Sequence, residues 1–168
     1  MIVRVVALAA GLLGGAAGSQ FPEYAQQYTQ RLGGAVDALG EVVADFDASA
    51  ADAGLSRDAA LAELQGSAFL EARRRDMTRT FQRYDRLRED LRMLERAGPF
   101  MRAYHAARMT DRDVARAAMA TFEPAVPLTL PGVIFAGTGF LAGMIAVWAV
   151  LRTLLWPITR RRAVAPGA

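Results

Sequence analysis

His105 is the only side chain of this sequence that titrates near neutral pH and could act as a general acid or base. The chain has no cysteine, which excludes disulfides, thiolate nucleophiles and cysteine-ligated zinc. A single histidine also has no second imidazole with which to build a histidine metal site. We therefore predict that the protein is not an enzyme and that it holds no catalytic residue, metal or cofactor.

Three other groups of residues have types that could bind a ligand. Asp45, Asp47 and Asp52 could hold a cation, but they lack the loop glycine and final glutamate of an EF-hand, and their spacing is helical. Residues 73–75 are consecutive arginines that could hold an anion, although an acidic helix elsewhere in the chain is a simpler partner. The pair Gly33–Gly34 has no phosphate-loop sequence around it.

Charge is distributed unevenly along the 168 residues. Residues 1–18 contain one arginine and no acid, and residues 152–168 contain four arginines and no acid. All seventeen acids lie between these ends, with the other fifteen arginines. The net positive charge of the chain therefore belongs to its termini, which argues against a basic face that binds nucleic acid.

The clearer of two apolar blocks is residues 131–157, whose first twenty positions after Pro131 carry no charge. About 20 apolar residues are enough to cross the hydrocarbon core as a helix, so we predict a transmembrane helix here. Trp156 is placed to anchor at the interface, and Arg152 can extend to the headgroups. Arg160, Arg161 and Arg162 then mark residues 158–168 as a basic cytoplasmic tail under the positive-inside rule.

The other apolar block, residues 1–20, fits either a cleaved signal peptide or a retained membrane helix. Arg4 suits the basic start of either one. Retention is favoured by the small-xxx-small spacing that lets membrane helices approach closely. That spacing is present in both blocks, as the overlapping pairs Gly11 with Gly15 and Gly14 with Gly18 in the first, and as Gly139 with Gly143 in the second. With both helices retained, both termini are cytoplasmic and residues 20–130 are periplasmic.

Between the blocks, residues 21–98 have the pattern of an antiparallel helical hairpin, with arms at 22–52 and 67–97 and a short helix at 57–65. Apolar residues follow a heptad repeat in each arm, as in a coiled coil. Folding one arm back on the other aligns the two seams. The predicted seam consists of Tyr28, Leu32, Ala35, Leu39 and Val42 on one arm and Met77, Thr80, Tyr84, Leu87 and Leu91 on the other.

The two arms also differ in charge. Residues 19–64 hold eight acids and two arginines, whereas residues 65–120 hold thirteen arginines and eight acids. In the same alignment Asp37, Glu41, Asp45 and Asp47 fall opposite arginines 73–75, 79 and 83. We therefore expect ion pairs across the hairpin that set its orientation more than its stability.

Helix glycines and the segment that follows the hairpin leave two questions open. Gly33, Gly34 and Gly40 each weaken the first arm by up to about 1 kcal/mol relative to alanine. They form either a packing surface for the chain's own short helices or a docking strip for another protein. Residues 99–130 contain short helices and a proline-rich linker, which lie either at the membrane surface or against the hairpin base.

Three stretches of the chain resemble a proteobacterial family of small two-span inner-membrane proteins of unknown function. These are SQFPEYAQQYTQRLGGAVDALGEVVADFD, GSAFLEARRRDM and FEPAVPLT. The resemblance extends from the first apolar block to the second. It implies two spans around a helical segment in a bacterial inner membrane, and it implies no catalytic residues.

We thus expect an all-α membrane protein, with two transmembrane helices that flank a periplasmic antiparallel hairpin and short accessory helices. The function that this favours is a non-enzymatic accessory or scaffold subunit, docked onto a larger inner-membrane complex through its spans and hairpin. The alternative is a homo-oligomeric envelope protein that organises the membrane or binds lipid or cell wall. A periplasmic ligand sensor is the third hypothesis.

Overall fold

The computed structural model describes residues 2–124, 126 and 128–163, with the backbone alone for Ile2 and for residues 155–163. The described residues form helices and connecting loops, with no strand among them. They divide into two compact units. The terminal unit contains Met1–Glu23 and Glu123–Ala168, and the central unit contains Tyr24–Phe122.

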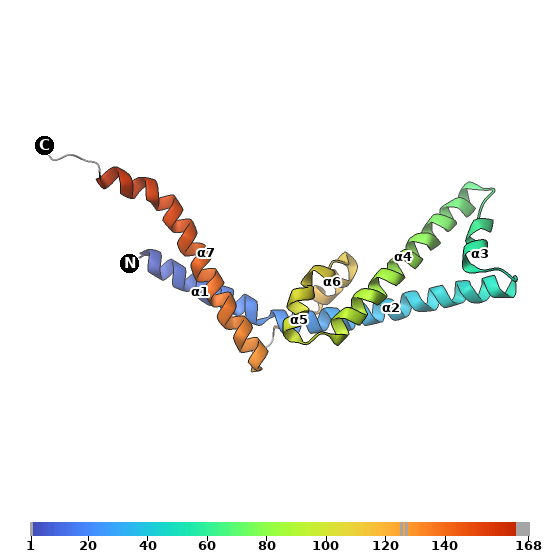
Figure 1. Cartoon of the computed structure of the whole chain (residues 1–168), viewed down its shortest axis with the longest axis horizontal. Helices are drawn as coiled ribbons and strands as arrows, with labels where there is room; N and C mark the ends of the chain where they lie inside the picture. Colours follow the sequence, from blue (N-terminus) through green and yellow to red (C-terminus); the bar gives the residue numbers. More distant parts are fainter. Residues whose placement is uncertain (1, 125, 127, 164–168) are drawn as a thin grey trace. The chain divides into compact units, whose positions relative to one another are not determined.

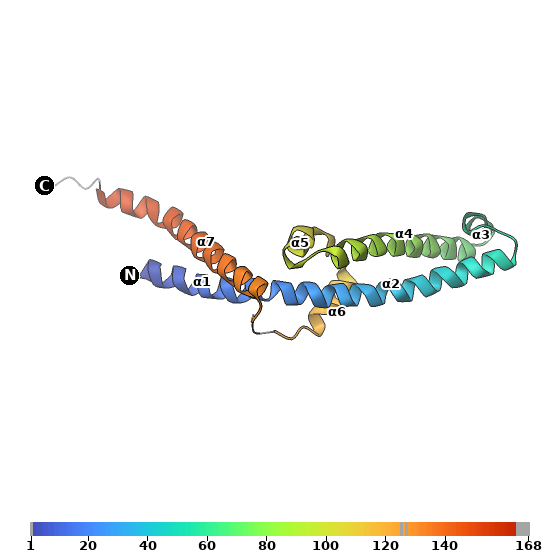
Figure 2. The same ribbon diagram turned by 60° about the horizontal axis from the view of Figure 1, so that its bottom comes forward.

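The terminal unit is built from two helices, α1 (Ile2–Ser19) and α7 (Leu130–Ala163), which lie side by side in both ribbon views (Figure 1, Figure 2). Thr129 begins α7, because its hydroxyl accepts a hydrogen bond from the Gly132 N–H at 3.3 Å. The helix continues past Pro157 and ends at Ala163, six residues beyond the predicted end of the span.

In the central unit, two long antiparallel helices are joined by a short one (Figure 2). These are α2 (Phe21–Asp52), α3 (Arg57–Glu63) and α4 (Ala68–Arg96). Gly54 and Gly66 have φ values of 72° and 91°, so the two turns at the tip use a conformation that glycine adopts most readily. Ser56 and Ser67 then cap α3 and α4 through their hydroxyl groups.

After α4 the chain returns to the hairpin through α5 (Pro99–Tyr104), the 3-10 helix η1 (His105–Arg108) and α6 (Arg112–Ala120). Val114 and Ala118 of α6 are buried in the hairpin core. Arg108 of η1 forms an ion pair with Asp90 of α4 at 2.9 Å. Of the two alternatives for this segment, the structure thus places α6 and η1 against the hairpin.

Two hydrophobic clusters hold the central unit together. The first joins α2, α4 and α6, and the second lies toward the tip, where Leu61 of α3 packs against it. In Figure 1 the arms separate toward this tip, and α3 lies between them. The first cluster contains Tyr28, Leu32, Val36, Leu87, Leu94, Val114 and Ala118, and the second contains Val43, Met77 and Phe81.

The buried face of α2 departs from the predicted seam along its second half. Tyr28 and Leu32 are buried, whereas Val42 is exposed and Val43 takes its place in the core. Val36, Val43 and Ala50 are buried at intervals of seven residues, so α2 keeps a heptad spacing. This buried row is displaced by one position from the predicted row that contained Ala35 and Val42.

The ion pairs of the hairpin also differ from those expected across its arms. Asp47 pairs with Arg57 of α3, with 2.7 Å between the Arg57 Nε and a carboxylate oxygen. Arg83 of α4 turns to α6, where it lies 3.0 Å from Asp111. Arg79 pairs with Asp76 on its own helix. Asp47 and Arg83 thus have their partners in the segments of α3 and α6, and Arg79 has its partner on α4, where we had expected partners on the opposite arm.

Candidate functional site

The contact between α1 and α7 is made by glycines at close backbone approach. A Cβ atom built on Gly14 would collide with the Gly139 carbonyl oxygen, and one built on Gly139 would collide with the Gly14 carbonyl oxygen. A Cβ on Gly18 would lie 2.6 Å from the Phe135 carbonyl oxygen, and one on Gly143 would lie 2.5 Å from that of Ala10. Both helices therefore need glycine where their backbones meet, as in close-packed membrane helix pairs.

Aromatic rings complete this interface beside the glycines. The Phe140 ring occupies the space above Gly11 and its β-carbon lies near Gly15, so one large side chain fits against two residues that have none. At the other end of α1 the rings of Phe21 and Phe135 lie 5.4 Å apart. The structure thus brings together the glycines that the sequence indicated in both helices, and it adds aromatic partners that spacing alone does not reveal.

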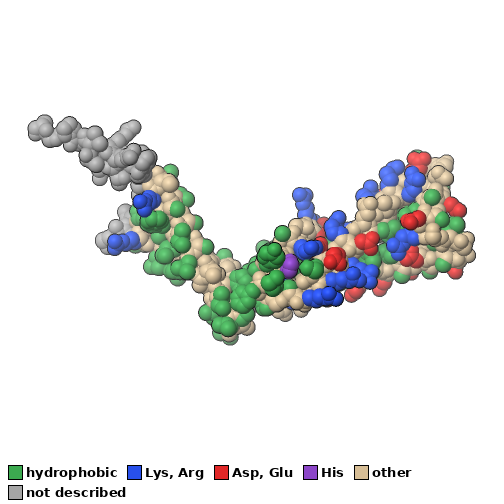
Figure 3. Space-filling view, in the orientation of Figure 1, with side chains coloured by type: hydrophobic (Ala, Val, Ile, Leu, Met, Phe, Trp, Pro, Cys, Tyr) green, Lys and Arg blue, Asp and Glu red, His purple; other side chains and the backbone are tan. Residues whose placement is uncertain are grey.

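The outer faces of the two helices are apolar and exposed. Leu13 of α1 is 74% exposed and Leu154 of α7 is 64% exposed. Hydrophobic side chains dominate the visible surface of this pair, whereas arginines and acids cover the central unit (Figure 3). By length and composition, the helical runs Val3–Asp52, near the N-terminus, and Leu130–Leu154 could each cross a membrane.

Basic residues lie at one end of the helix pair. Arg4 is in the first turn of α1, and the Arg152 guanidinium carbon lies 5.1 Å from the centre of the Trp148 ring on α7. This distance is typical of a cation–π contact. The predicted interfacial residues Trp156, Arg160, Arg161 and Arg162 lie outside the residues whose side chains the structure describes.

The glycines of α2 do not share one role. Gly40 faces the Tyr84 ring, which a Cβ would approach to 3.4 Å. In contrast, a Cβ on Gly33 or Gly34 would have no described atom within 4 Å apart from its own helix backbone and chain neighbours. Of the two alternatives for the glycines of α2, packing against the described short helices therefore accounts for neither Gly33 nor Gly34.

Polar groups buried between α2, α4 and α6 were not apparent from the sequence. Tyr28 is fully buried, and among the described residues its hydroxyl has no partner in hydrogen-bonding geometry. Burial and the nearby Asp111 and Asp90 carboxylates raise the pKa of Tyr28 to about 12, against a smaller opposing effect of the Asp111 backbone. Asp90 itself is 8% exposed. The sequence did contain an indication that Asp90 is buried. Asp90 lies three residues after the buried Leu87, so the two residues share one face of α4.

We predict that Tyr28→Phe leaves the free energy of unfolding unchanged or raises it by up to about 1 kcal/mol. The substitution removes a buried hydroxyl that has no described partner in hydrogen-bonding geometry, so no well-formed hydrogen bond is lost with it. Unfolding in denaturant, followed by circular dichroism, measures the effect. Tyr28→Ala is the control and should lose about 3–5 kcal/mol because it empties the core. A loss above 1 kcal/mol in Tyr28→Phe would contradict the prediction.

The histidine, the three aspartates and the three consecutive arginines that could have done chemistry do not form one site in the structure. His105 lies in η1 beside the Tyr104 ring, with ring centres 5.2 Å apart. Asp47 is occupied by Arg57, whose hydrogen bond lowers the pKa of that carboxyl. Within the described part of the chain, no cluster of histidine and acidic residues could hold a metal ion. Residues 73–75 form no ion pair with any described acid.

The chain matches a known protein family along most of its length. Neither the curated proteins nor the solved structures include a match to this chain. The match is to a family model described as a protein of unknown function (DUF2937), and it covers residues 2–160, which include both long apolar helices and the whole central unit. The chain therefore belongs to the DUF2937 family of proteins of unknown function.

Proposed function

We propose that this protein is a non-enzymatic accessory or scaffold subunit of a larger bacterial inner-membrane complex. In this proposal α1 and α7 are retained as two transmembrane helices, both termini are cytoplasmic and the central unit is periplasmic. The helix pair anchors the chain, and the central unit presents α2 to a partner protein.

Support for the membrane location comes from the surface of the helix pair. Its glycines lie inside the interface, and many of its large apolar side chains are exposed on the outer faces, which a water-soluble helix pair would avoid. The interlocking of α1 with α7 also favours retention of α1, because a cleaved signal peptide would need no fitted partner. By the positive-inside rule, the arginines at the start of α1 and after residue 151 favour a cytoplasmic position for that end of the helix pair.

The observation that carries the docking proposal is the open surface at Gly33–Gly34. Each glycine in the interior of α2 costs about 1 kcal/mol relative to alanine, and the described chain makes no contact that would need them. A helix surface without side chains lets a second backbone approach closely. A partner helix or strand that packs here would account for both glycines.

The test is to purify the protein from its native host in mild detergent, and to compare it with two leucine variants. Gly34→Leu fills the open surface and should keep the fold, since a Cβ there meets nothing. It should lose a stoichiometric foreign partner that the unchanged protein retains. Ala51→Leu, at an exposed position in the last turn of α2, is the matched control and should keep the partner.

Two mass measurements decide between the alternatives. The native mass of the complex distinguishes a foreign partner from a second copy, and a second copy alone would favour the homo-oligomeric envelope protein. A monomer without any partner would contradict the docking proposal. The intact mass of the purified chain should include residues 1–18, and their loss would contradict the two-span anchor.

A further inference from the structure

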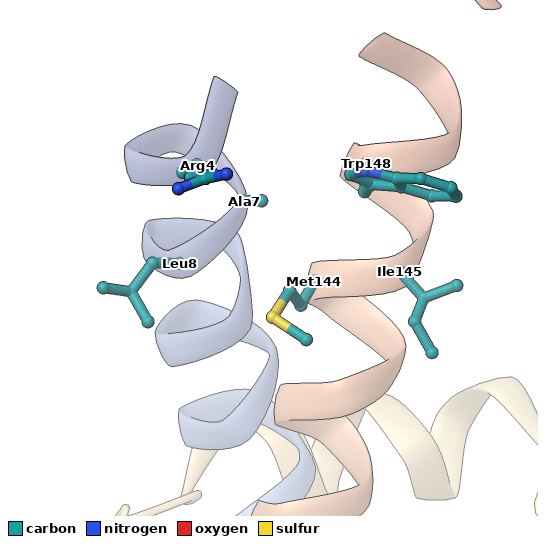
Figure 4. A pocket seen from close by; sticks show the side chains of 6 residues that line it. All are labelled: Arg4, Ala7, Leu8, Met144, Ile145 and Trp148. Atoms are coloured by element: carbon teal, nitrogen blue, oxygen red, sulfur yellow. The ribbon is translucent and has the colours of Figure 1, made fainter. Parts of the chain in front are cut away.

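An open groove lies between α1 and α7, near the start of α1. Its volume is about 480 Å³, within the range of about 300–1,000 Å³ that ligand sites occupy. Arg4, Ala7 and Leu8 line it from α1, and Met144, Ile145 and Trp148 line it from α7. In Figure 4, Met144 points toward α1, while Arg4 and Trp148 lie at the same end of the groove. Five of the six lining residues are apolar or aromatic, so the groove suits a hydrocarbon chain.

One guanidinium group lines this groove, and a second contacts one of its lining residues. Arg4 lines it directly, and Arg152 lies over the ring of Trp148, which also lines it. Residues 1–22 and 124–168 contain no aspartate or glutamate. Neither Arg4 nor Arg152 has an ion pair among the described residues. Arg4 thus lies in the lining of this groove and Arg152 lies against it, and no carboxylate is among the six lining residues.

An anionic phospholipid matches both properties of the groove. Its acyl chain can lie against Leu8, Met144 and Ile145, and its phosphate can accept hydrogen bonds from the two arginines. Basic pockets between transmembrane helices on the cytoplasmic side are a common binding place for anionic lipid headgroups. The alternative is that both arginines extend into water, which solvates their charge. In that case the apolar groove would have no preference for one lipid over another.

We propose that this groove binds an anionic phospholipid of the cytoplasmic leaflet, with Arg4 and Arg152 at its phosphate and its acyl chain between α1 and α7. The inference rests on the proposed insertion of both helices in the membrane. It is independent of whether the central unit docks onto another protein. It gives the basic end of the helix pair a specific role beyond that of setting orientation.

Native mass spectrometry of the full chain in mild detergent tests whether the protein prefers a lipid with an anionic headgroup. The probes are dioleoyl-phosphatidylglycerol, which is anionic, and dioleoyl-phosphatidylcholine, which is zwitterionic with the same acyl chains. We expect the protein to bind the first lipid in preference to the second. Arg4→Gln and Arg152→Gln should each weaken binding of the anionic lipid about fivefold, the usual contribution of one arginine near an anionic membrane surface. Arg75→Gln, at an exposed and unpaired arginine of α4, should have no effect.

A second pair of variants tests the groove without a change in charge. Ile145→Trp fills it and should reduce anionic lipid binding while both arginines remain. Val150→Trp is the control, because Val150 is 56% exposed and lies about 140° around α7 from Ile145. Equal binding of the two lipids, or unchanged binding in Arg4→Gln and Ile145→Trp, would overturn the proposal.

Extraction of membranes with alkaline carbonate separates this result from a failure of membrane insertion. If the unchanged protein is released by carbonate, then α1 and α7 do not span the membrane, and the proposed function and the lipid site are both wrong. If the protein stays in the membrane but shows no preference for the anionic lipid, the lipid site alone is wrong. Retention in the membrane together with the expected preference supports both.

Discussion

Gly139→Ala should lower the stability of the α1–α7 pair by about 1–3 kcal/mol. The added Cβ would collide with the carbonyl oxygen of Gly14, and a backbone atom cannot move aside as a flexible side chain can. The two helices must therefore separate along the whole contact, and this range is usual for an overpacked interior. Gly139→Leu should abolish the contact, because its larger side chain leaves no arrangement in which the backbones meet.

Gly137→Ala is the matched control for this prediction. It lies two residues away on the same helix, and a Cβ there would have no described atom within 4 Å beyond its own helix backbone and neighbours. Alanine is a better helix former than glycine, so Gly137→Ala should be neutral or slightly stabilising. Equal losses in the two variants would contradict the packing that we describe.

Tryptophan fluorescence measures the stability of the α1–α7 pair in both variants. Both tryptophans of the chain, Trp148 and Trp156, lie in α7, so their emission reports on the terminal unit. Thermal unfolding in detergent should show an earlier fluorescence transition in Gly139→Ala. The far-ultraviolet circular dichroism of the chain, most of whose helices lie in the central unit, should keep its main transition at the same temperature as in the unchanged protein.

Much of this fold could be predicted from local sequence signals. The turn glycines and the capping serines mark the ends of α3 and α4, because each acts within a few residues of its own position. The glycine spacing in the two apolar blocks also pointed to close helix packing. The Phe140 ring at Gly11 could not be predicted in this way, since it depends on the relative rotation of α1 and α7.

The hairpin contacts were harder to predict because they depend on how far apart the arms lie. The expected pairing of Asp37 with Arg83 assumed that the two arms face only each other, whereas α6 also packs against both arms in the first cluster. Arg83 then finds Asp111 on α6, twenty-eight residues along the chain. The charges in the sequence indicate that ion pairs will form, but the positions of the helices determine which acid pairs with which arginine.

Asp111→Ala should destabilise the central unit by about 2–4 kcal/mol, because it removes two interactions at once. One carboxylate oxygen of Asp111 caps α6 by accepting from the N–H groups of Asp113 and Val114, which is worth about 1 kcal/mol. The carboxylate also receives two hydrogen bonds from Arg83, at 3.0 and 3.1 Å. Loss of one member of a buried pair costs about 3–5 kcal/mol, but the Arg83 side chain is 35% exposed, so water recovers part of this.

Asp113→Ala is the control for the ion pair. Its carboxylate lies 3.3 Å from the same arginine, but its side chain is 67% exposed, so we expect a loss of no more than about 0.5 kcal/mol. Denaturant unfolding followed by circular dichroism measures both variants. Similar losses in Asp111→Ala and Asp113→Ala would contradict the assignment of the buried carboxylate as the link between α4 and α6.

The stabilisation by Asp111 should also depend on pH. Burial opposes ionisation of this carboxyl, but the hydrogen bonds from Arg83 and from the Val114 and Asp113 N–H groups outweigh it, so its pKa lies below the ordinary value. A depressed pKa stabilises the fold above the unfolded-state pKa of about 3.9, and this stabilisation is lost as pH falls through the lower folded-state pKa. Asp111→Asn keeps the side-chain shape and cannot ionise. The difference in the free energy of unfolding between the unchanged protein and this variant should therefore be largest at neutral pH and should shrink as the pH falls below about 4. A difference that is constant with pH would show that the charge of Asp111 contributes nothing to stability.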